Sequence, residues 1–227
     1  NSLLRSRGKL FYIGMSAFTH SISQHGGGTI VDIECRLSNN LPNIVIVGSA
    51  NKAVGEARER IRGAFADSRI MLPRKRITVN LAPADIPKAD SGFDLAIAVS
   101  ILLAANQVPP INAQAAFIGE LGLDGRTRPV RGIIGKLLTG RAYGLTTFYV
   151  PTVNLSQAQL VPRLTLLPVQ DLRQLFEHLA GIRPIAAVYT AGGRLQTPKA
   201  AAYTGLQLSD VIGQQQAKHQ TWRMATK

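Results

Sequence analysis

The chain has 227 residues, 45% of them hydrophobic, and a formal net charge of +13. This composition excludes a disordered or fibrous protein and allows a buried core. No apolar run reaches the roughly 18 residues that a transmembrane helix needs, and the N-terminus lacks the apolar region of a signal peptide. The single cysteine, Cys35, excludes an internal disulfide. We therefore expect a cytoplasmic protein with no membrane partner.

The positive charge is spread unevenly along the chain. Residues 1–14 carry +3, residues 15–180 carry +5 and residues 181–227 carry +5. Because basic tails attract polyanions without specificity, the total charge alone does not indicate a nucleic-acid site. Pattern and composition divide the chain into an N-terminal extension (1–14, with Met15 as the expected natural start), one folded domain (15–181), a linker rich in Ala, Gly, Pro and Thr (182–207), and a last segment (208–227) that begins like a capped helix.

Strand and helix patterns alternate through the folded domain. The sequence predicts strands at 29–38, 43–48, 76–83, 115–123, 146–151 and 164–169, and helices at 52–68, 93–104, 133–144 and 169–181. Glycines at 26–28 predict a hairpin before the first strand, and Asp124-Gly125 predicts another. Because the alternation lacks strict βαβ regularity, we expect an α/β (α+β) domain with a mixed sheet and packed helices.

The helix predicted at 52–68 shows a clear amphipathic pattern. Its apolar stripe is formed by Val54, Ala57, Ile61, Ala64 and Phe65. On the opposite side, Glu56 and Arg60 are spaced for an ion pair in solvent.

A candidate nucleophile lies in "PKADSGFDLAIAVSILLA", residues 87–104. Ser91 stands beside a glycine at the start of an apolar helix, with Lys88 three residues upstream. A serine in this place can be a nucleophile or a helix cap. The string "HGGG" at 25–28 resembles an esterase oxyanion loop, but the G-x-S-x-G partner is absent, and a glycine hairpin explains it better.

Nucleotide and metal sites have little support in the sequence. Gly135-Lys136 lacks the leading glycine and the hydroxyl residue of a P-loop. Asp85, Asp90 and Asp94 recur around a helix start and could bind magnesium, but the helix dipole favours acidic residues there in any case. We therefore expect no cofactor and no metal in this chain.

Two basic clusters could together bind phosphate groups. "RERIR" contributes Arg58 and Arg62 from a helix, and "RKR" contributes Arg74, Lys75 and Arg76 before a strand. Aromatic residues for base stacking are not interleaved in these strings, and neighbouring glutamates neutralise part of the helix. A solvated charged face is the alternative interpretation.

Three long strings resemble a known family. "LSNNLPNIVIVGSANKAVGEARERIRGAFADS", "RITVNLAPADIPKADSGFDLAIAVSILLA" and "IGELGLDGRTRPVRG" are similar to the N-terminal domain of the Mg-chelatase-like AAA+ family that includes ComM and YifB. "LSDVIGQQQAK" is similar to the opening of the family's ATPase module, just before its P-loop. After Lys218 the sequence "HQTWRMATK" departs from the family. Residues 208–227 thus resemble a truncated start of the AAA+ module.

The resemblance implies a fold and a function. It implies a Lon-protease-like fold, of the ribosomal protein S-five domain-two superfold, fused to a hexameric ATPase that uses ATP and Mg. ComM-type members act as DNA helicases that drive branch migration during natural transformation, so competence, DNA binding and self-association through the hexamer are expected of the parent protein. Without the P-loop, this fragment is not expected to hydrolyse ATP.

The same superfold allows the candidate nucleophile to be judged. Active Lon-type domains carry the serine in a "PKDGPSAG"-like string and its activating lysine in a "GGLKEKL"-like string. Aligned without gaps, Gly92 takes the serine position, Ile134 takes the lysine position and Lys136 matches a second lysine. Since one residue rotates a helical side chain by about 100°, we expect Ser91 to cap the helix and the dyad to be lost.

The leading hypothesis is a non-catalytic accessory domain that contributes to oligomer assembly or to DNA contact through Arg58, Arg62, Arg74, Lys75 and Arg76. One alternative is a divergent Lon-like serine protease that uses Ser91 with Lys88 or Lys136. Another is a pure assembly module that binds no nucleic acid.

Overall fold

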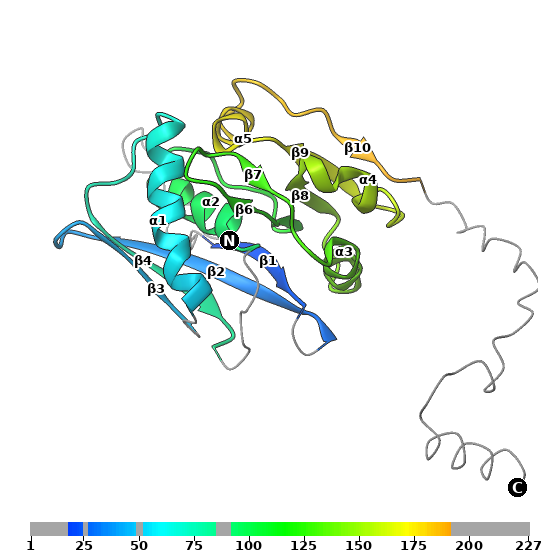
Figure 1. The fold of residues 1–227 in the computed structure, drawn as a ribbon, viewed down its shortest axis with the longest axis horizontal. Coiled ribbons are helices and arrows are strands. Elements are labelled where there is room, and N and C mark those ends of the chain that lie inside the picture. Colours follow the sequence, from blue (N-terminus) through cyan, green and yellow to red (C-terminus); the bar gives the residue numbers. More distant parts are fainter. Residues whose placement is uncertain (1–17, 25–26, 49–51, 85–91, 192–227) are drawn as a thin grey trace, which may run out of the picture. The chain divides into compact units, whose positions relative to one another are not determined.

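The computed structural model describes residues 18–24, 27–48, 52–84 and 92–191 (Figure 1). Its strands are β1 (Phe18–Ser23), β2 (Thr29–Ser38), β3 (Asn43–Val47), β4 (Arg76–Ala82), β5 (Ala115–Phe117), β6 (Glu120–Leu121), β7 (Thr127–Arg128), β8 (Thr147–Pro151), β9 (Thr165–Val169) and β10 (Val188–Tyr189). Its helices are α1 (Lys52–Asp67), α2 (Asp94–Ala104), α3 (Ile133–Ala142), the 3-10 turn η2 (Thr152–Asn154), α4 (Leu155–Ala158) and α5 (Leu172–Leu179).

Eight strands form one mixed sheet in the order β10-β9-β8-β5-β1-β2-β4-β3. The pairs β1–β2, β2–β4 and β9–β10 are antiparallel, while β3–β4, β1–β5, β5–β8 and β8–β9 are parallel. β6 and β7 form the separate hairpin that Asp124-Gly125 predicts. The predicted α/β class with a mixed sheet is therefore confirmed.

The glycine hairpin before β2 is also confirmed. Ser23 of β1 pairs with Thr29 of β2, and the chain turns between them. Gly27 and Gly28 both have φ of +95°, a backbone conformation that strongly favours glycine.

Helices cover both faces of the sheet, but not along its whole width. α1, α2 and α5 pack on one face, where they bury a large apolar cluster with β2, β4 and β9. α3 and α4 pack on the opposite face, over a second cluster that includes Ile22, Phe148 and Leu166. Figure 1 shows α1 and α2 beside the strands β1–β4, and α3 near one end of β1.

The predicted apolar stripe of α1 is buried at four of its five positions, and the side chain of the fifth, Val54, lies outside the described residues. Ala57, Ile61, Ala64 and Phe65 have almost no exposed surface. The predicted pair of Glu56 and Arg60 is present with its charged atoms 4.0 Å apart, but Arg60 is largely buried and makes a shorter contact toward the core.

Arg60 binds Asp94, which lies in the first turn of α2. Its Nε and Nη2 atoms donate to the two Asp94 carboxylate oxygens over 2.7 and 3.1 Å, and the Leu121 amide donates to Asp94 over 3.0 Å. Burial raises the pKa of the Asp94 carboxyl to about 6, because desolvation outweighs these hydrogen bonds. Asp94 lies at the helix N-terminus, where the helix dipole favours an acidic residue as predicted. Its main interaction is nevertheless the buried ion pair with Arg60.

α2 is the most deeply buried helix of those described. Residues 94–102 are all buried, so its position depends on a few polar contacts. Besides Asp94, the Thr19 hydroxyl of β1 donates to the Ala96 carbonyl over 2.9 Å. The N-cap residue is Phe93, while the predicted cap Ser91 lies outside the described residues.

The folded unit extends past residue 181. The chain divides into residues 1–191 and 192–227, and all described residues belong to the first unit. Within the predicted linker, β10 pairs with β9 and Ile185 is buried. Nδ1 of His178 accepts a hydrogen bond from the Ile185 amide over 2.9 Å, and Nε2 lies 3.1 Å from the Tyr149 hydroxyl. Residues 182–190 are therefore anchored to the domain.

Among the described residues, no helix has both the length and the apolar character needed to cross a bilayer.

We expect Asp94→Ala to lower the free energy of unfolding by about 3 kcal/mol, because it leaves a largely buried guanidinium without its carboxylate. Urea denaturation at neutral pH measures this loss. The matched variant Glu56→Ala removes only the 4.0 Å exposed contact and should cost less than about 0.5 kcal/mol. Equal losses in the two variants would contradict the assignment of Asp94 as the main partner of Arg60.

The contact of His178 with Ile185 predicts a pH dependence. Burial lowers the pKa of His178 below its ordinary 6.5, so the unfolded chain binds the proton more readily than the folded one. The contribution of His178 to stability should therefore fall as the pH drops below about 6.5, by at most about 1.4 kcal/mol per pH unit. Unfolding curves at pH 7.5 and 5.5 should show a smaller fall in His178→Gln, whose amide oxygen can still accept from Ile185. An identical fall in both proteins would refute this origin.

Candidate functional site

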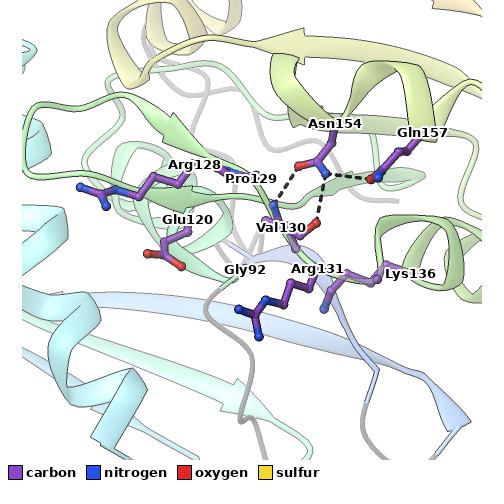
Figure 2. A pocket seen from close by; sticks show the side chains of 10 residues that line it. Gly92, Glu120, Arg128, Pro129, Val130, Arg131, Lys136, Asn154 and Gln157 are labelled. Atoms are coloured by element: carbon purple, nitrogen blue, oxygen red, sulfur yellow. Dashed lines mark hydrogen bonds between the residues drawn. The ribbon is translucent and has the colours of Figure 1, made fainter.

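A cavity of about 840 Å³ opens beside Gly92, between the turn that enters α2 and the N-terminal end of α3. Figure 2 shows the side chains that line it. They include the cationic groups of Arg128, Arg131 and Lys136 and one carboxylate, Glu120. The lining is thus polar and carries more positive than negative charge.

The segment from β7 to α3, residues 127–132, forms one wall of the cavity and is held by Asn154. The Asn154 Oδ1 atom accepts from the Val130 amide over 2.8 Å, and its Nδ2 donates to the Val130 carbonyl over 3.0 Å (Figure 2). Nδ2 also donates to Gln157 over 3.3 Å. Gly132 ends the segment with φ of +67°, which allows the chain to turn into α3. One buried amide side chain thus fixes the wall.

Lys136 is 1% exposed and reaches the cavity from α3. Its Nζ atom donates to the Ile22 carbonyl over 2.6 Å and lies 5.8 Å from the centre of the Phe93 ring. These contacts hold the Lys136 amine beside Ile22 and Phe93 at the floor of the cavity.

The structure brings only some of the predicted dyad positions together. Gly92, at the aligned serine position, lines the cavity, and so does Lys136. Ile134, at the aligned lysine position, is 38% exposed and does not line it. Two residues along a helix differ by about 200°, which explains why Ile134 and Lys136 face opposite ways. The candidates Ser91 and Lys88 lie outside the described residues.

Other reactive groups give no second centre in the described part of the chain. Burial raises the pKa of the Cys35 thiol to about 12, so this thiol is protonated and a poor nucleophile at neutral pH. Within the described ranges, no three His, Cys, Asp or Glu side chains are grouped to hold a metal ion. Asp94 is bound to Arg60, and the predicted companions Asp85 and Asp90 lie outside the described residues.

The two basic clusters predicted from the sequence meet at one end of the sheet. The Nη2 atom of Arg62 donates to the Asn43 side chain over 3.1 Å, and Asn43 pairs with Arg76 across β3 and β4. Arg58 lies one turn before Arg62 on α1, and both contact Glu59. We call Arg58, Arg62, Arg74, Lys75 and Arg76 the basic edge.

The cations of the turn before β4 are the more available part of the basic edge. Arg74, Lys75 and Arg76 are exposed, and within the described residues no carboxylate lies within ion-pair distance of them. A further arginine that the sequence reasoning missed, Arg36, is exposed on β2 beside this cluster. Because Arg36 follows the buried Cys35 in an alternating strand, the sequence predicts that Arg36 is exposed. Only the pairing of β2 with β4 shows that it lies next to Arg76.

Comparison with known proteins agrees with this architecture. The sequence model of the family described as "Subunit ChlI of Mg-chelatase" matches residues 33–154, more than half of the chain. The chain belongs to this Mg-chelatase-like family. The match spans the basic edge and most of the cavity wall, including Lys136 and Asn154.

Several curated proteins match most of the chain. Competence protein ComM of Haemophilus influenzae is 36% identical over 195 residues, which are 83% of this chain and 37% of ComM. The uncharacterized protein YifB of Salmonella typhimurium is 36% identical over 193 residues, 83% of this chain and 36% of YifB. Lon protease 2 of Herpetosiphon aurantiacus is 26% identical over 182 residues, 75% of this chain and 21% of that protease. The chain of this Mg-chelatase-like protein thus spans well under half of the length of these relatives.

The cavity wall gives a stability prediction. Asn154→Ala leaves the Val130 amide and carbonyl without their buried partner, and we expect the free energy of unfolding to fall by about 2 kcal/mol. Gln157→Ala is the control, since Gln157 is exposed and makes only a 3.3 Å contact with Asn154, so its loss should stay below about 0.5 kcal/mol. Thermal or urea unfolding of both variants measures the difference. A small loss in Asn154→Ala would show that the segment is held by other contacts.

Proposed function

We propose that this chain is a non-catalytic accessory domain of a Mg-chelatase-like AAA+ ATPase and that it contacts nucleic acid through the basic edge. The parent protein would bind ATP and Mg in its motor module, assemble as a cytoplasmic hexamer and act on DNA in the manner of ComM. Family membership and the name of the Haemophilus relative, a competence protein, support this proposal. The similarity to Lon protease 2 supports the expected Lon-like superfold.

The observation that carries the nucleic-acid proposal is the meeting of the two basic clusters. Arg62 and Arg76 are brought to one place by Asn43, although 14 residues separate them in the sequence. Two acidic groups, Glu56 and Glu59, lie on the same helix, and Glu59 is shared by Arg58 and Arg62. The cations before β4 have no such neutralisation among the described residues. An unneutralised group of exposed cations is suited to phosphate contacts.

The non-catalytic part of the proposal rests on the cavity. Gly92 brings no side chain to the aligned serine position, and Ile134 brings no amine to the aligned lysine position. Lys136 does reach the cavity, where its Nζ atom donates to the Ile22 carbonyl over 2.6 Å, but it is not at the aligned position of the activating lysine.

One observation favours a second candidate, a divergent serine protease. Lys136 and Gly92 line the same cavity, and Ser91 is the sequence neighbour of Gly92. An active-site phosphonate should leave the protein unlabelled if our proposal holds. Labelling that Ser91→Ala and Lys136→Met each abolish would establish the protease instead.

Binding of the chain to DNA should depend on salt and on the basic edge. We expect the triple variant Arg74→Glu, Lys75→Glu, Arg76→Glu to bind more weakly and to lower the slope of log affinity against log salt by about 3 for duplex DNA and about 2 for a single strand, because about three phosphate contacts are lost. Fluorescence anisotropy at several salt concentrations measures both quantities.

The matched control for this experiment is Arg163→Glu with Arg183→Glu, two exposed arginines near β9 and α5. It should leave the slope within about 0.5 of the original. Unchanged affinity and slope in the triple variant would refute the basic edge. No salt-sensitive binding by the original chain, together with concentration-dependent self-association, would favour the pure assembly module.

A further inference from the structure

One half of the sheet has a face that no described helix covers. On β1, β2 and β4, alternate side chains point away from α1 and α2, and they are exposed or half-buried. α3 packs against the neighbouring part of this face, around Ile22 and Ile30. We call the uncovered part the open face; its residues are Phe18, His20, Asp32, Glu34, Arg36, Arg76, Thr78 and Asn80.

Two arginines lie together on the open face. Arg36 of β2 pairs with Thr78 of β4, and Arg76 pairs with Ser38. Arg36 and Arg76 are therefore diagonal neighbours on one face, within about 8 Å at their Cβ atoms. Both are exposed, and among the described residues neither has a carboxylate within ion-pair distance. Arg76 also belongs to the basic edge, so the open face continues it.

An exposed aromatic ring lies at the other side of the open face. Phe18 of β1 is 42% exposed and pairs with Glu34, two residues from Arg36 on β2. Its ring meets the His20 ring edge to face, with centroids 5.3 Å apart. His20 is in turn held by Asp32 over 2.7 Å. The His20 ring thus holds the Phe18 ring in place, and the exposed part of the Phe18 ring is available for a base to stack on.

Charge differs across the open face. Arg36 and Arg76 are cationic, whereas Glu34 and Asp32 lie beside the aromatic ring. Carboxylates repel phosphate but accept hydrogen bonds from exocyclic amino groups of bases. A strand of nucleic acid would therefore place its phosphates toward the arginines and a base toward Phe18.

We propose that the open face binds single-stranded nucleic acid, with a base stacked on Phe18 and the adjacent phosphates on Arg36 and Arg76. This inference rests on the proposed nucleic-acid contact and names its substrate class and two further residues, Phe18 and Arg36. Duplex DNA keeps its bases stacked inside, so it can reach the arginines but cannot use the ring. The single strand is selected by the aromatic contact, and the affinity for both forms comes from the cations.

The test measures the affinity of the full chain for a labelled 20-nucleotide oligodeoxycytidine, whose bases carry an exocyclic amino group, and for a duplex of the same length. Phe18→Leu keeps an apolar side chain and removes the ring; it should weaken single-strand binding by about tenfold and leave duplex binding unchanged. Phe18→Trp should keep the single-strand affinity. Arg36→Gln should weaken both and lower the single-strand salt slope by about 0.7.

Matched controls are Tyr143→Leu, which removes a ring that is 64% exposed at the end of α3, and Arg183→Gln. Both should bind like the original chain, and circular dichroism confirms that each variant is folded. Two results would overturn the proposed role of the open face and leave the proposed function standing. In the first, Phe18→Leu weakens binding of the single strand and of the duplex equally. In the second, Phe18→Leu and Arg36→Gln have no effect, while the triple variant of residues 74–76 still loses binding. Absence of salt-dependent binding to either probe by the original chain would overturn both.

Discussion

The ion pair between Arg60 and Asp94 fixes the relation between the two helices on which the domain is built. α2 is buried along residues 94–102, and its apolar contacts carry little directional preference. The bidentate contact does not tolerate a shift of the helix, because each Asp94 oxygen has its own donor on Arg60 and one also accepts from Leu121. The positions of α1, α2 and the β6–β7 hairpin relative to one another are therefore fixed together.

The same ion pair also determines where the cavity lies. Phe93 and Gly92 immediately precede Asp94, so the pair fixes where the turn into α2 meets the sheet. The Gly92 carbonyl accepts from the Gly119 amide over 3.0 Å, next to β6. Asn154 holds Val130, whose side chain lies directly against Gly92. Polar contacts made from inside the core therefore hold both of these segments that line the cavity.

Local sequence pattern predicted most of the elements, because each has a strong period of its own. The alternation in β2, the stripe of α1 and the turn at Asp124-Gly125 are all local signals. The partner of Arg60 could not be predicted, since Asp94 is 34 residues away and a surface pair with Glu56 fits the same helical spacing. The role of Asn154 and the place of β10 depend likewise on long-range pairing. The basic residues could be found as strings in the sequence. The residues that lie near them in the fold, Asn43, Arg36 and Phe18, come from other strands and could not be found in this way.

The way helices are distributed over the sheet explains where a large ligand can bind. On β8 and β9 both faces are buried, by α5 on one side and by α3 and α4 on the other, so these strands serve only the core. β2 and β4 are buried on one face, and their other face carries Asp32, Glu34, Arg36 and Asn80 in place of apolar residues. Among the described residues no helix covers this polar face, so it is the part of the sheet on which the single strand proposed above would bind.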